Sequence, residues 1–266
     1  MATMTASPVR LKSIAFPPEH GSWGFLLEPI VLGLLVAPSV AGVFLSLAAL
    51  GAFLARHPLK FVITDHRKGK RYARTVAAER FALVYSAVAL IGAGMAVLLA
   101  GFEWLLPLVI AVPFALAQVV DYVQNKGRDL VPELAGSCAI AVTASCLVLA
   151  GGGSITLALM LWIILIARSI PSILYVRARL RLEKGKPFSI RPVLISNSVA
   201  LLVVSALALL DEIPVLVVIG VAVLFGRAVY GLSRYRKAAP AKIIGIWEMI
   251  YGLMLVVLAA VGYGLG

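Results

Sequence analysis

Two carboxylates and a histidine accompany the first long apolar run of this 266-residue chain. Residues 17–29 read PPEHGSWGFLLEP and contain Glu19, His20 and Glu28. A histidine titrates near neutral pH, and a carboxylate in an apolar setting usually has a partner or a function. We therefore predict Glu28 and His20 as acid–base residues and Glu19 as a residue that contacts a ligand. The alternative is that Glu28 only pairs with an arginine from another segment.

A second set of residues is suited to binding an anion. Arg168 lies within the apolar sequence IILIARSIP, where an arginine needs a carboxylate or an anionic ligand as its partner. Guanidinium groups bind carboxylates and phosphates through paired hydrogen bonds. The other predicted substrate-binding residues stand near the ends of apolar runs: Asp65, Arg71, Arg74, Tyr122, Lys126, Glu133 and Arg177. The alternative for any single cation is a solvated loop charge. No metal-ligating residue is predicted, because the sequence lacks the ligand spacing of a metal site.

The elements that must position these residues are membrane helices. The chain is 62% hydrophobic and 14% charged, and its mean hydropathy is +1.02. A spanning helix needs roughly 20 apolar residues to cross about 30 Å of hydrocarbon. Nine runs approach that length: 23–39, 40–54, 81–99, 104–122, 131–149, 155–174, 193–210, 213–230 and 243–263. We predict an all-α, multi-pass bundle of about nine transmembrane helices. Its N-terminal segment is 1–21, and 22–266 form a single transmembrane domain.

The net charge of +12 is distributed unevenly along the chain. With nine spans, all 24 Lys and Arg residues fall on one side of the bundle, if Arg168 and Arg227 are counted with the basic connections that follow them. The connections on the opposite side carry Glu103, Asp211 and Glu212. Because basic loops stay in the cytoplasm, this partition predicts a cytoplasmic N-terminus and a C-terminus outside. The same cations would attract anionic membrane lipids. Nucleic acid is not a predicted partner, since no zinc-finger, RNP or helix-turn-helix pattern accompanies the charge.

The segment Pro18-Glu19-His20-Gly21-Ser22-Trp23-Gly24 resembles the opening of the YwiC-like family of bacterial integral membrane proteins. That family begins its first span with a Pro-x-(Glu or Gln)-His-Gly-x-Trp pattern, and no activity is firmly attached to it. The resemblance implies a multi-pass protein of the bacterial cytoplasmic (inner) membrane.

The nine-span layout is also similar to that of the UbiA prenyltransferase superfamily. Its members bind Mg²⁺ and a prenyl diphosphate through Asp-rich motifs after spans two and six. Tyr122 and Lys126 match its Tyr-x-x-x-Lys pattern, and Thr64-Asp65 stands where its first Asn-Asp would be. The other acidic positions are occupied by Lys68, Tyr72, Arg177 and Arg181. The Asp-rich motifs are therefore not retained. Because Mg²⁺ needs oxygen ligands, no magnesium site is assigned, and the cofactor stays unknown.

Three functions follow from these observations. The first is a UbiA-like transferase, or an inactive relative, that binds an isoprenoid or a phosphorylated lipid at a cavity on the cytoplasmic side. The second is a carrier of an anionic or proton-coupled substrate, in which Glu28 and Arg168 form a gated ion pair. The third is a non-catalytic membrane assembly factor.

Overall fold

The structure is a computed structural model, and it describes residues 11–16, 20–123 and 130–265. Every regular element within these ranges is a helix. The elements are α1 (Leu11–Ala15), α2 (His20–Val36), α3 (Val40–Arg67), α4 (Ala73–Ala100), the 3₁₀ turn η1 (Glu103–Leu105), α5 (Leu106–Val123), α6 (Leu130–Ala150), α7 (Ile155–Glu183), α8 (Arg191–Leu209), α9 (Val215–Leu232) and α10 (Ala241–Leu265). Each of the nine predicted apolar runs falls on one of these helices.

Among the described residues, seven helices are long and apolar enough to cross a membrane: α3, α4 and α6 to α10. Two further apolar stretches are shorter: Trp23–Val36 in α2, and Glu103–Phe114, which spans η1 and the first part of α5. The chain is therefore a multi-pass, all-helical membrane protein.

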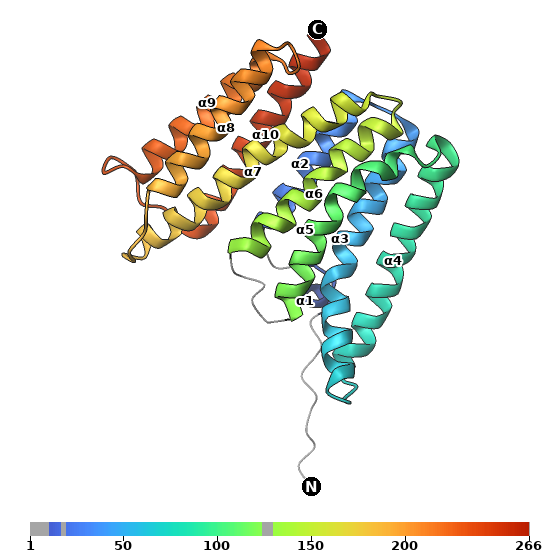
Figure 1. Ribbon diagram of the computed structural model, residues 1–266. Helices are drawn as coiled ribbons and strands as arrows, with labels where there is room; N and C mark the ends of the chain where they lie inside the picture. The colour runs from blue at the N-terminus through green and yellow to red at the C-terminus, as the bar shows by residue number, and fades with distance from the viewer. Residues whose placement is uncertain (1–10, 17–19, 124–129, 266) are drawn as a thin grey trace.

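The helices form two groups with α2 between them (Figure 1). The first group contains α3 to α6 and the second contains α7 to α10. Helix α2 packs against α6 and α3 on one side and against α10 and α7 on the other. A polar group on α2 can therefore meet side chains of the first group or of the second, depending on the face that carries it.

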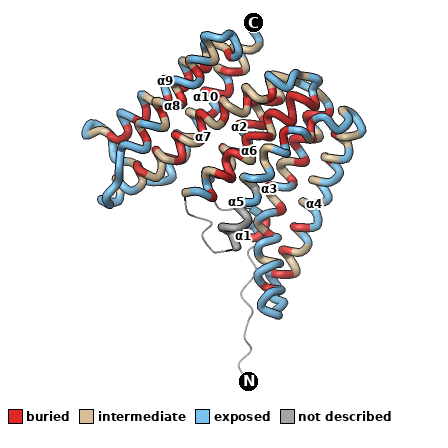
Figure 2. Tube along the Cα trace, in the orientation of Figure 1, coloured by how far each residue is buried: buried red, intermediate tan, exposed pale blue. Residues whose placement is uncertain are grey.

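Buried positions concentrate on α6, while α4 is mostly exposed (Figure 2). The approach of α4 to α3 is nevertheless very close, because glycines stand at the contact. A Cβ on Gly51 would lie 2.7 Å from the backbone nitrogen of Ala89, and a Cβ on Gly92 would lie 2.9 Å from that of Ala48. Small residues of this kind let membrane helices pack backbone to backbone.

Successive long helices run antiparallel, so their connections alternate between the two ends of the bundle (Figure 1). The connections after α3, α7 and α9 share one end and carry most of the loop cations. The connections with Glu103, Asp211 and Glu212 lie at the other end. Helices α3 and α7 continue well beyond their predicted apolar runs, to Arg67 and Glu183. Both extensions carry basic residues toward the same end.

Candidate functional site

A buried ion pair joins α2 to α7. The guanidinium Nη2 of Arg168 lies 2.6 Å from Oε1 of Glu28, and the two side chains are only 4% and 7% exposed. The Arg168 guanidinium also lies 5.1 Å from the ring centroid of Phe25, one turn before Glu28 on α2. Both charges are thus removed from solvent, and each depends on the other for compensation.

Helix α10 closes over this pair at a glycine. A Cβ added to Gly252 would lie 2.5 Å from Cδ of Glu28 and 2.6 Å from Nη2 of Arg168. No real Cβ atom approaches that closely, so only glycine fits here without displacing the ion pair. One turn earlier on α10, the carbonyl oxygen of Glu248 accepts a hydrogen bond of 2.9 Å from Arg168 Nη2.

A second ion pair continues from the first. Arg227 on α9 pairs with the carboxylate of Glu248. Arg227 Nη2 also donates to the hydroxyl of Ser172 on α7 at 3.3 Å. Its guanidinium lies over the rings of Tyr175 and Tyr251, at 4.2 and 5.3 Å from their centroids. We call Glu28, Arg168, Glu248 and Arg227 the buried charge network; it links α2, α7, α10 and α9.

The network is balanced in charge but not in hydrogen bonds. Two carboxylates face two guanidinium groups, so the formal charges cancel. Several of the buried polar atoms have no hydrogen-bond partner: Nε of Arg168, Nε of Arg227, Oε2 of Glu248 and Oγ of the adjacent Ser169. The gap beside Glu28, Arg168 and Gly252 is too small to admit a water molecule. The gap is therefore closed, and the network around it keeps hydrogen-bond donors and acceptors that are buried without a partner.

The other predicted binding residues whose side chains the structure describes form separate ion pairs. Nη2 of Arg74 lies 2.6 Å from Asp65 Oδ1, and Thr75 donates to the same carboxylate at 2.8 Å. Arg71 pairs with Glu79 at 2.6 Å. Near the start of α6, Glu133 pairs with Arg177 of α7 at 2.5 Å, and both side chains are more than a third exposed. The structure therefore joins Glu28 to Arg168, Asp65 to Arg74 and Glu133 to Arg177, at three different places.

Four predicted residues lie outside this description. Glu19 and Lys126 are outside the described residues. His20 and Tyr122 fall within α2 and α5, but their side chains lie outside the described part of the chain. Within the described residues, no three His, Cys, Asp or Glu side chains form a group that could hold a metal ion.

Two members of the network were missed by the sequence prediction. The sequence pattern groups Arg227 with the basic connection after the eighth run, but Arg227 lies inside α9 and is 9% exposed. Glu248 was not singled out at all. A signal was available, because Arg227 lies five residues before the end of α9 and Glu248 seven residues after the start of α10. In an antiparallel helix pair, those positions lie at similar depth.

The family model described as YwiC-like protein matches residues 16–150 of the chain. The chain belongs to the YwiC-like family. The matched region ends at the last residue of α6. Glu28 of this family member thus lies inside the matched region, while its partners on α7, α9 and α10 follow it. Neither the curated proteins nor the solved structures contain a match to this chain.

Proposed function

We propose that the protein is a membrane carrier for a small anion, coupled to protons, and that the buried charge network is its closed binding site. The observation that carries this proposal is the alternation of carboxylate and guanidinium groups, buried where α2 meets the second helix group. Ionisable residues buried among membrane helices are rare and typically mark substrate paths or proton relays.

Stability alone is a weak reason for such a network. Removing two charges from water costs several kcal/mol per ion, and well-packed apolar residues of similar size often do as well or better. A pair that must separate during function has a reason to remain ionisable. The unpartnered Nε groups of Arg168 and Arg227 support this view, because a bound anion could accept hydrogen bonds from both.

The proposed cycle follows from charge balance. When Glu28 takes up a proton, it no longer neutralises Arg168, and the guanidinium needs another negative partner. A small anion that pairs with Arg168 restores the balance, so one proton and one anionic charge enter together. Release of both returns the closed ion pair. The movement that opens the site would separate α2 from α7 and α10.

We further propose nine spans in a bacterial cytoplasmic membrane, with the N-terminus in the cytoplasm and the C-terminus outside. The support is the sharing of one end by the basic connections after α3, α7 and α9 (Figure 1). Positive charge is retained on the cytoplasmic side during insertion. The anion would therefore meet a positive surface at the cytoplasmic end of the bundle.

The carrier proposal is tested in proteoliposomes that contain a trapped pH-sensitive dye. Outward-to-inward gradients of nitrate, phosphate, sulfate, formate and acetate are imposed in turn. We expect at least one of these anions to acidify the lumen above the rate in protein-free vesicles. We also expect Arg168→Gln to abolish that rate, whereas Arg80→Gln, which removes an exposed cation of α4, retains it. Equal rates in vesicles with and without protein for every anion would overturn the proposal for these solutes.

A second candidate is a UbiA-like transferase or inactive relative that binds an isoprenoid or lipid with an anionic head. One observation favours it: the connections after α3 and α7 share one end of the bundle, as the resemblance requires (Figure 1). Native mass spectrometry of the purified protein separates the candidates. A co-purified isoprenoid or phosphorylated lipid that Glu28→Gln or Arg168→Ala releases would favour this second function.

A further inference from the structure

Two connections in the chain have the same sequence and the same backbone conformation. Lys68-Gly69-Lys70 follows α3, and Lys184-Gly185-Lys186 follows α7. The two glycines have φ values of 62° and 63°, in the left-handed region that glycine adopts without strain. In both turns, the two lysine N–H groups donate to the carbonyl oxygen of the residue three positions before the first lysine.

The turns differ in the charge of that capped residue. It is Asp65 after α3, and its carboxylate is held by Arg74 and Thr75. It is Arg181 after α7, so the second turn has a third cation where the first has an acid. Nε of Arg181 donates to the carbonyl oxygen of Pro187 at 2.9 Å, which holds its side chain over the connection.

The three cations of the second turn surround a hollow. Arg181, Lys184 and Lys186, together with Leu180, line a space of about 280 Å³ that is open to the surface. Within the described part of the chain, none of the three forms an ion pair. By contrast, Arg71, Arg74, Arg168, Arg177 and Arg227 each face a carboxylate.

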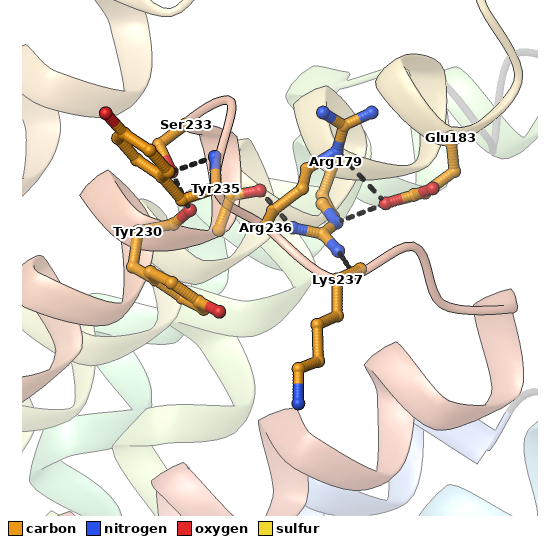
Figure 3. Close-up of polar contacts among 8 residues, drawn as sticks. Arg179, Glu183, Tyr230, Ser233, Tyr235, Arg236 and Lys237 are labelled. Carbon is orange, nitrogen blue, oxygen red and sulfur yellow. Dashed lines mark hydrogen bonds and ion pairs between the residues drawn. The ribbon is translucent and has the colours of Figure 1, made fainter.

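The nearest acid in sequence is already engaged. Glu183 lies between two arginines, with its Oε1 2.8 Å from Nε of Arg179 and 3.4 Å from Nε of Arg236 (Figure 3). Arg179 also donates to the carbonyl oxygens of Gly231 and Lys237, which ties α7 to the connection after α9. The carboxylate is thereby compensated by cations of its own cluster, and the hollow keeps its positive charge.

Apolar side chains follow the cations on the same connection. Phe188 and Ile190 are 36% and 38% exposed, just before α8 begins at Arg191. Cations beside exposed apolar residues, at the end of membrane helices, are typical of protein that lies at the head-group level of a bilayer. A free phosphate would satisfy the cations but would leave both apolar side chains uncovered.

We propose that this hollow binds the phosphate head group of an anionic membrane phospholipid. The cations Arg181, Lys184 and Lys186 contact the phosphate, and Phe188 and Ile190 lie against its acyl chains. The site is separate from the buried charge network and does not depend on the carrier function.

The test uses the full chain purified in detergent and native mass spectrometry. Phosphatidylglycerol and phosphatidylcholine with the same acyl chains are titrated in parallel, and the first bound lipid is quantified. The variant Lys184→Gln/Lys186→Gln removes two of the three cations. The matched control is Lys68→Gln/Lys70→Gln, which removes the same two charges from a turn of the same backbone. Thermal unfolding of both variants checks that they are folded.

The Lys184→Gln/Lys186→Gln variant is expected to lose about thirtyfold in phosphatidylglycerol affinity, since it removes two cations that each contribute about 1 kcal/mol near a membrane surface. Its phosphatidylcholine affinity and the affinities of the control variant should change little. Equal losses in both variants, or no loss in either, would overturn the proposal. Inorganic phosphate that displaces phosphatidylglycerol completely from the unmutated protein would also overturn it, because the ligand would then be a free anion.

Discussion

At the scale of single residues, the buried ion pair depends on a glycine from a third helix. Gly252 leaves just enough room on α10 for the carboxylate of Glu28 and the guanidinium of Arg168. The ion pair therefore requires that position 252 carry no side chain. It also supplies a control in the same helix, because a Cβ on Gly245 would meet nothing within 4 Å.

Gly252→Ala is expected to destabilise the protein by about 1–3 kcal/mol, since the added methyl group must displace Glu28, Arg168 or α10 itself. Gly245→Ala should be neutral or slightly stabilising, because alanine is the better helix former. Thermal unfolding of the two variants in one detergent measures the difference. If Gly252→Ala unfolds at the same temperature as Gly245→Ala, α10 does not close over the ion pair as described.

Neutralising Glu248 should destabilise the protein more than neutralising a surface acid would. Glu248→Gln leaves the buried Arg227 without a charged partner, and breaking such a pair costs about 3–5 kcal/mol. Adding Arg227→Gln removes the uncompensated charge, so the double variant should be more stable than Glu248→Gln alone. Denaturation of the two single variants and the double variant gives this cycle directly. Strictly additive losses would mean that the two side chains are not coupled.

At the scale of helices, the α3–α4 pair depends on backbone contact at two glycines. Gly92 faces the backbone of Ala48, whereas Gly94, two residues along α4, has open space around it. We expect Gly92→Ala to separate the two helices and lower the unfolding temperature. Gly94→Ala on the exposed face should leave it unchanged or raise it. The contact would be refuted if the two alanine variants had the same unfolding temperature.

Hydropathy predicted the positions of the helices only where they lie in the hydrocarbon of the membrane. All nine apolar runs fall on helices, because each run must satisfy its own backbone hydrogen bonds in lipid. Hydropathy ends where the membrane ends, so it missed the polar extensions of α3 to Arg67 and of α7 to Glu183. Each extension is followed by a lysine–glycine–lysine turn, at residues 68–70 and 184–186.

The site was predictable only in part, for a different physical reason. Glu28 and Arg168 are conspicuous because each interrupts an apolar run, and they do meet. The contact of this pair with α10 could not be predicted, because Arg168 and Glu248 are 80 residues apart and nothing in the sequence indicates that they meet. Arg227 was hidden by its position near the end of its helix, where a cation resembles an ordinary loop charge.

At the scale of the whole molecule, α2 connects two helix groups, and the charge network lies where it meets the second. The proposed orientation places the connection after α3 inside the cell and the connection before α5 outside. A membrane-impermeant maleimide should therefore label Lys70→Cys only in inside-out vesicles and Phe102→Cys only in right-side-out vesicles. Both native cysteines, Cys138 and Cys146, are buried and should give little background. Labelling of both positions from one side would contradict the topology.

The central claim is that Glu28 takes up the proton that accompanies the anion. The most direct test compares anion uptake by the unmutated protein, Glu28→Gln and Glu103→Gln in vesicles with and without an imposed pH gradient. Glu103 is an exposed carboxylate at the opposite end of the bundle and serves as the control. We expect Glu28→Gln to remove the stimulation of uptake by the pH gradient, and Glu103→Gln to keep it. Full stimulation in Glu28→Gln would mean that Glu28 does not take up the coupled proton.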